Sequence, residues 1–169
     1  MKYNKTMSIP VGDNPFAVLT LIAAPAVFTN ASSVLALGTG NRLARVVDRT
    51  RELGKFLRAT QHEDKEIEQM WNHQLERLER RGGLLVRAIG YFYTSIGAFA
   101  AASLVSILAA SLAGSRYNLP FDVIAIISLA VGIVGFVGLS VGCFLLVKET
   151  RLALQSHFEE AKLIRSRLK

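Results

Sequence analysis

The chain has 169 residues, of which 51% are hydrophobic and 20% are charged, and its formal net charge is +7. The charges gather in blocks between long uncharged stretches, whereas a soluble domain of this length mixes polar and apolar residues at the period of its helices or strands. This distribution excludes an ordinary water-soluble globular domain and predicts an integral membrane protein.

Three uncharged runs, residues 16–37, 88–115 and 123–147, set the predicted architecture. About 20 apolar residues of helix span a hydrocarbon core of roughly 30 Å, and a backbone in lipid must satisfy its own hydrogen bonds. We therefore expect an all-α membrane protein with three transmembrane helices, a cytoplasmic helical hairpin and a C-terminal amphipathic helix. The expected divisions are residues 1–40 for the extracellular N-terminus and first transmembrane helix, 41–83 for the hairpin, 84–147 for the second and third transmembrane helices with a short external loop near 114–121, and 148–169 for the cytoplasmic C-terminal helix.

The first run is predicted to be a retained span because it is too long for a signal peptide and a block of arginines follows it. Unlike the other runs, it carries several hydroxyl and amide side chains. Polar residues at membrane depth usually face protein or water, and rings of such residues select ions in pores. Helix packing also uses small and hydroxyl residues, which is the alternative interpretation. The candidate pore-lining residues, on one face of the helix and at its outer end, are Asp13, Thr20, Ala23, Val27, Asn30, Ser33 and Leu37.

The basic residues predict the orientation in the membrane. Residues 41–83 hold ten lysines and arginines and residues 148–169 hold six, whereas the other side holds only Lys2, Lys5 and Arg116. Lysine and arginine near the ends of spans stay in the cytoplasm. With three spans, the N-terminus is therefore expected outside and the C-terminus in the cytoplasm. The residues expected to form a basic ring where the first helix enters the cytoplasm are Arg42, Arg45 and Arg49.

The hairpin in residues 41–83 is predicted from apolar residues at helical spacing before and after a short break at residues 60–62. Gly82 and Gly83 are predicted to break or kink the chain where it returns to the membrane. The C-terminal segment continues the pattern with a further apolar stripe. Two helices alone bury little surface, so we expect these stripes to form a small bundle or to contact other subunits.

Small residues recur along the second and third spans, and in the second they follow a four-residue period. Such residues let helix backbones approach closely in lipid, where no hydrophobic force drives association. A four-residue ridge drifts by about 40° per step around a helix of 3.6 residues per turn, so it passes more than one neighbour. We expect contacts between copies of the chain, with packing of the two spans within one chain as the alternative. The predicted packing residues are Gly90, Thr94, Ala98, Ala102, Ser106, Gly132, Gly135, Gly138 and Gly142.

No catalytic, cofactor-binding or metal-binding constellation is expected. The sequence has no phosphate-binding loop and no nucleophile paired with a base, and its three histidines share no ligand spacing. Cys143 lies alone inside the third span, where a small buried side chain is the simplest interpretation. The basic segments match no nucleic-acid-binding motif, and membrane orientation already accounts for their charge.

The segment N-R-L-A-R-V-V-D-R-T-R-E-L at 41–53, with two further spans and the V-K-E-T-R-L-A-L exit of the third, resembles a family of small bacterial membrane proteins classed as a domain of unknown function. The resemblance covers residues 15–155 and is specific for 41–53; Asp13 lies outside it. It implies a bacterial inner-membrane protein, a basic and acidic helical hairpin and paired C-terminal spans. It implies no activity and no site residues.

Two functional hypotheses follow from these patterns. The first is a homo-oligomeric ion channel in the lipid bilayer, with the first helix lining the pore, the cytoplasmic helices forming the inner vestibule, and inorganic ions as the permeating species. The second is a non-conducting scaffold or accessory subunit that binds another protein through its cytoplasmic helices. A transporter is disfavoured because three spans offer no inverted repeat within one chain.

Overall fold

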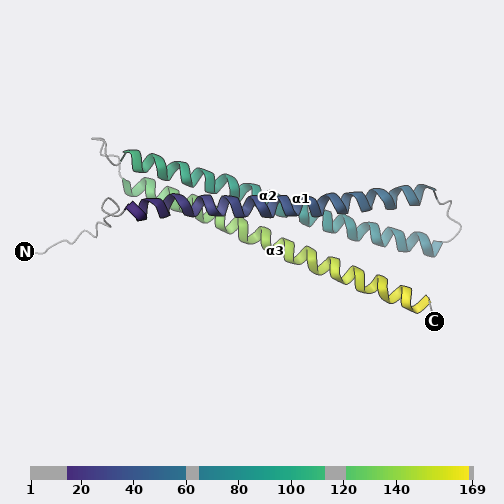
Figure 1. The fold of residues 1–169 in the computed structure, drawn as a ribbon. Helices are drawn as coiled ribbons and strands as arrows, with labels where there is room; N and C mark the ends of the chain where they lie inside the picture. Colours follow the sequence, from purple (N-terminus) through teal and green to yellow (C-terminus); the bar gives the residue numbers. More distant parts are fainter. Residues whose placement is uncertain (1–14, 60–64, 113–120, 168–169) are drawn as a thin grey trace, which may run out of the picture.

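The computed structural model describes residues 15–59, 65–112 and 121–167, with side chains for most of the residues from Ala23 to Gln155. These ranges form three long helices, α1 (Pro15–Ala59), α2 (Lys65–Leu112) and α3 (Phe121–Arg167), and no other regular structure (Figure 1). At 1.5 Å per residue the helices are about 68, 72 and 70 Å long, more than twice a hydrocarbon core of roughly 30 Å. The predicted all-helical fold is confirmed.

Two of the helices are long and apolar enough to cross a membrane. The candidate spans are Trp71–Leu108 in α2 and Ile126–Gln155 in α3, and only 28% and 17% of their most apolar windows are buried inside the protein. A core helix of a soluble protein would be mostly buried. For α1, where the side chains of residues 16–22 lie outside the described part, the span stays a prediction.

The middle helix holds the bundle together. α2 packs along both α1 and α3, whereas α1 and α3 make few contacts with each other. The buried side chains of α2 include Leu85, Ala88, Phe92 and Phe99. Figure 1 shows α1 and α2 crossing near their middle, while the C-terminal half of α3 separates from them.

The outer half of the bundle is joined by an aromatic cluster with one ring from each helix. Phe28 of α1 stacks on Phe99 of α2 with ring centroids 5.3 Å apart, and it meets Phe136 of α3 edge-on at 6.1 Å. Aromatic pairs at these distances and angles add to the stabilisation from area burial. They keep α1 and α3 close at this level even though the two helices otherwise share few contacts.

The predicted helix break at Gly82 and Gly83 is wrong, because α2 continues through both residues. A glycine in a helix costs about 1 kcal/mol relative to alanine, and packing on both sides outweighs that cost. A Cβ at Gly82 would meet Val46 of α1 at 3.8 Å, an ordinary contact distance. The expected divisions after residues 40, 83 and 147 therefore fall inside continuous helices. The expected break at 60–62 and most of the external loop lie outside the described residues.

Candidate functional site

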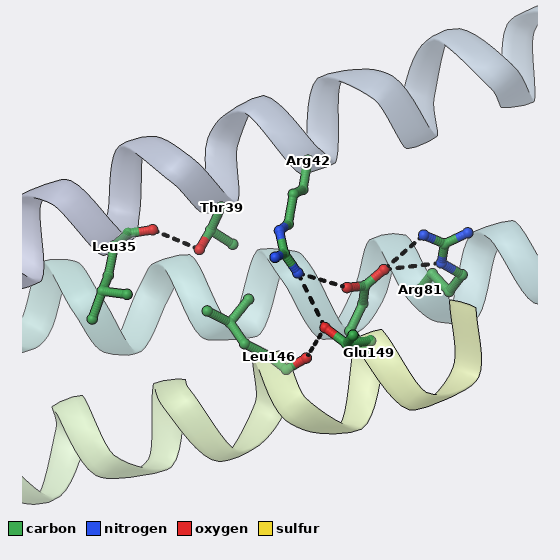
Figure 2. A network of polar contacts seen from close by, with 7 residues as sticks. Leu35, Thr39, Arg42, Arg81, Leu146 and Glu149 are labelled. Atoms are coloured by element: carbon green, nitrogen blue, oxygen red, sulfur yellow. Dashed lines mark hydrogen bonds and ion pairs between the residues drawn. The ribbon is translucent and has the colours of Figure 1, made fainter. Parts of the chain in front are cut away.

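A cluster of charged side chains links all three helices where the apolar section of α3 ends (Figure 2). Its centre is Glu149 of α3, which is only 2% exposed. Arg81 of α2 donates from Nε (2.9 Å) and from Nη2 (2.8 Å) to the Oε1 atom of Glu149. Arg42 of α1 places its Nη1 3.5 Å from the Oε2 atom and donates a 3.1 Å hydrogen bond to Thr150 Oγ1.

Neighbouring hydroxyl groups in this polar layer donate to backbone carbonyl oxygens of their own helices. Thr150 donates to the carbonyl oxygen of Leu146 at 2.9 Å, and buried Thr39 donates to the carbonyl oxygen of Leu35 at 2.6 Å (Figure 2). A buried carboxylate is stable only when charged partners and hydrogen bonds replace its water. Two arginines supply these partners to Glu149, so the cluster ties α1, α2 and α3 together and keeps a net charge of +1.

The three arginines of the predicted basic ring lie in different surroundings. Arg42 points towards α3 and belongs to the charge cluster. Arg45 is exposed and has no ion-pair partner within the described residues. Arg49 pairs with Glu52 of the same helix at 3.3 Å, and both side chains are exposed. Exposed pairs of this kind contribute little to stability. The structure therefore does not bring the three side chains together within one chain.

Three of the predicted packing glycines bring α3 close against α2. A Cβ at Gly135 would lie 2.9 Å from the ring of Phe99, and one at Gly142 would lie 2.5 Å from the ring of Phe92. At Gly138 the same atom would lie 2.7 Å from the hydroxyl of Ser95. These distances are well below ordinary contact, so the two backbones approach this closely only because the residues are glycine. A Cβ at Gly132 would meet no atom within 4 Å.

The four-residue ridge of α2 changes its surroundings along the helix. At its outer end Ala102 and Ser106 are buried, and Ser128 of α3 lies 2.8 Å from the Ser106 hydroxyl and donates to the Ala102 carbonyl oxygen at 3.1 Å. Ala98 is half-buried. At the inner end Gly90 and Thr94 are exposed. This is the drift expected of a four-residue period on a helix of 3.6 residues per turn.

The predicted pore-lining face of α1 points away from the other two helices. Val27 and Leu37 are 65% and 70% exposed, and Ala23, Asn30 and Ser33 are also exposed. The opposite face of α1 is buried, as the residues Ser32, Ala36 and Thr39 show. Asp13 lies outside the described residues, and so does the side chain of Thr20.

Asn30 is the most polar side chain on this outer face. The hydroxyl of its neighbour Ser33 donates to the Thr29 carbonyl oxygen at 2.8 Å, so it is satisfied within its own helix. The amide of Asn30 has no hydrogen-bond partner within the described part of the chain. Water can satisfy an exposed amide of this kind, whereas lipid offers it no hydrogen bonds.

The exposed face forms a straight seam along α1. Ten of the exposed residues of α1 can be followed at alternating intervals of four and three, which is an average period of 3.5 residues; other exposed residues lie on either side of this line. A seam of this period stays on one side of a slightly supercoiled helix and is the pattern by which parallel helices associate. The ten exposed positions of the seam are Ala23, Val27, Asn30, Val34, Leu37, Asn41, Ala44, Asp48, Arg51 and Lys55.

The amino-acid sequence matches the model of a known protein family. The model of DUF2721, described as a protein of unknown function, matches residues 22–157. The chain belongs to the DUF2721 family. The match confirms the resemblance predicted from the sequence, and it includes the charge cluster and the seam of α1 from Ala23 onwards. No curated protein and no solved structure matches this DUF2721 protein.

Sequence reasoning missed Glu149 as the centre of the charge cluster in this DUF2721 protein. The signal was available, because Glu149 is an acidic residue two positions after the uncharged run 123–147, where basic residues are the expected flank. An acid at that depth needs a basic partner, and the inner ends of the other two spans both offer arginines. Within the described residues, no group of three or more histidine, cysteine, aspartate or glutamate side chains is placed to hold a metal ion.

Proposed function

We propose that this DUF2721 protein is a homo-oligomeric ion channel of the bacterial inner membrane. In this proposal the chain crosses the bilayer three times, with its N-terminus outside and its C-terminus in the cytoplasm. Several copies arrange their α1 helices around an axis, and the exposed seam of α1 lines the conduction path. The cytoplasmic parts of α1, α2 and α3 form the inner vestibule.

The assignment of α1 as a third span is supported by its packing. Ala36 belongs to the same core cluster as Ala88 and Phe92 of the α2 span, and Phe28 stacks on Phe99 of the same span. These contacts support a placement of residues 28–36 at the depth at which α2 is apolar. A helix at that depth is surrounded by lipid or by protein.

The observation that carries the proposal is the exposure of Asn30 on the seam of α1. Burying an amide without a hydrogen bond costs about 1–3 kcal/mol in proteins. If Asn30 faced lipid, each chain would bear this cost. When Asn30 faces an axis shared with other copies, its amide meets water, ions or other amides. The seam also continues past Leu37 as Asn41 and Ala44, so an amide and a small side chain would line the path where it reaches the cytoplasm.

The test is electrical recording from purified protein in planar bilayers. Asn30→Leu makes the proposed lining apolar without changing the contacts of α1 with α2, and it is expected to reduce unitary conductance strongly or abolish it. Ser33→Leu, at an exposed residue beside the seam, is expected to act in the same direction with a smaller effect. Val134→Leu is the matched control, since Val134 is 57% exposed on α3 and faces away from the proposed path. Equal conductance in wild type and Asn30→Leu refutes the pore.

The second candidate is a non-conducting scaffold that binds a partner protein through its cytoplasmic helices. Its support is apolar surface in the cytoplasmic part, where Val47 and Leu154 are 38% and 57% exposed. Silence at every voltage, pH and membrane tension, together with a stoichiometric partner lost on Leu154→Glu, favours this function. Unitary currents that change with Asn30→Leu favour the channel.

A further inference from the structure

The guanidinium group of Arg42 has binding capacity that the protein does not use. Its five N–H donors make one hydrogen bond, from Nη1 to Thr150 Oγ1, and the 3.5 Å approach to Glu149 is an ion pair rather than a good hydrogen bond. The side chain is 47% exposed. Arg81 already donates twice to the other carboxylate oxygen, so Glu149 is neutralised without Arg42.

The position of Arg42 corresponds to the headgroup layer of the inner leaflet. It follows Leu37, the last apolar residue of the predicted first span, by five residues or roughly 7 Å of helix. Glu149 follows Val147, the end of the third run, by only two residues. The headgroup layer on each side of a bilayer is about 5–8 Å thick. The free donors of Arg42 therefore lie at the level of lipid phosphates.

The charge around Arg42 favours an anion. Arg42 and Arg81 together exceed Glu149 by one positive charge, and the neighbouring side chains Arg45 and Lys148 are exposed without ion-pair partners in the described part of the chain. Arginine binds phosphate through two parallel N–H···O hydrogen bonds. Contact with Thr150 and Glu149 already holds the Arg42 guanidinium between α1 and α3, so little side-chain entropy is lost when a ligand binds.

We propose that Arg42 is the centre of a binding site for the phosphate of an anionic phospholipid in the inner leaflet. The ligand class is a phosphodiester without its own cation, such as phosphatidylglycerol. A zwitterionic headgroup carries an ammonium group that the surplus positive charge repels. The proposal rests on the membrane placement given above and not on conduction, so an absence of current leaves it intact.

The test is competitive lipid binding measured by native mass spectrometry on the full chain in detergent, with equal amounts of phosphatidylglycerol and phosphatidylcholine. Wild type is expected to retain more phosphatidylglycerol, and Arg42→Gln is expected to lower this preference roughly fivefold, the equivalent of about 1 kcal/mol for one basic residue. Arg42→Lys keeps the charge without the bidentate fork and is expected to lie between the two.

Arg49→Gln is the matched control, because it removes the same charge from the same helix two turns farther from the membrane. It is expected to keep the wild-type preference. An unchanged preference in Arg42→Gln overturns the site, and an equal loss in both variants overturns it in favour of diffuse surface charge. Inorganic phosphate that displaces phosphatidylglycerol at equal concentration overturns the lipid as the ligand. Circular dichroism checks that Arg42→Gln, which leaves the pair of Arg81 and Glu149 in place, is still folded.

Discussion

Replacing Gly142 with alanine is expected to separate α3 from α2 and destabilise the protein. The new Cβ would lie 2.5, 2.9 and 3.0 Å from three atoms of the Phe92 ring. Carbon atoms in good contact lie about 3.5–4.0 Å apart, so about 1 Å of movement is needed. Phe92 has no exposed surface and belongs to the core cluster with Ala36 and Ala88. The ring therefore has little room to turn, and the helices must move.

The expected size of this effect follows from two opposing contributions. Overpacking a well-packed core costs about 1–3 kcal/mol, whereas glycine to alanine inside a helix gains up to about 1 kcal/mol. Gly142→Ala is thus expected to lose up to about 2 kcal/mol. Gly132→Ala has no atom within 4 Å of the new Cβ and keeps only the gain. The two variants make the same chemical change on the same helix and should move stability in opposite directions.

Thermal unfolding of the purified protein in one detergent measures the difference. For a chain of this size 1 kcal/mol shifts the midpoint by about 2–4 °C, so Gly142→Ala should melt several degrees below Gly132→Ala. Adding Phe92→Leu to Gly142→Ala should recover part of the loss, because a smaller, more flexible side chain leaves space for the Cβ. Gly142→Ala melting at or above Gly132→Ala would refute the close packing of α2 and α3.

Three further predictions concern polar contacts between helices. Glu149→Gln is expected to lower the free energy of unfolding by about 2–3 kcal/mol. This loss is smaller than the about 3–5 kcal/mol typical of breaking a fully buried ion pair, because the Arg81 side chain is 21% exposed. An unchanged melting temperature would contradict this prediction. Arg81→Gln should lower the melting temperature more than Arg42→Gln, since Arg81 makes two short contacts with Glu149 and Arg42 one long one; the reverse order would show that Arg42 is the main partner. Ser128→Ala should cost only about 0.6 kcal/mol, typical of hydrogen bonds between membrane helices, and a loss above about 2 kcal/mol would mean that Ser106 is left unsatisfied.

Composition and periodicity were sufficient to predict that the protein is helical, but they placed a helix break at Gly82 and Gly83 where α2 is continuous. Long uncharged runs predict helices, and the apolar spacing in residues 41–83 predicts that helical structure continues beyond the first run. The close approach at Gly135, Gly138 and Gly142 follows from the same reasoning, because only residues without a Cβ allow it. Each of these inferences uses a property of a single helix.

What the sequence did not reveal depends on how the helices are rotated against one another. Gly82 and Gly83 resemble a helix terminus locally, and the packing of α2 against α1 overrides that preference. Glu149 of α3 pairs with Arg81 and Arg42 of the other two helices. Both arginines lie 68 or more positions before it in the sequence. The rotation of each helix about its own axis decides which of its arginines turns towards Glu149. A single sequence does not show which residues pair between helices.

The central claim is that the seam of α1 meets the same seam in other copies. The most direct measurement is disulfide cross-linking in membranes with Asn30→Cys in a Cys143→Ala background, compared with Leu129→Cys in that background. Leu129 is 66% exposed on α3 and is expected to face lipid. The account predicts rapid cross-linking between chains for Asn30→Cys and little for Leu129→Cys. The proposed contact would be contradicted if Asn30→Cys stayed monomeric under oxidising conditions in which Leu129→Cys becomes cross-linked.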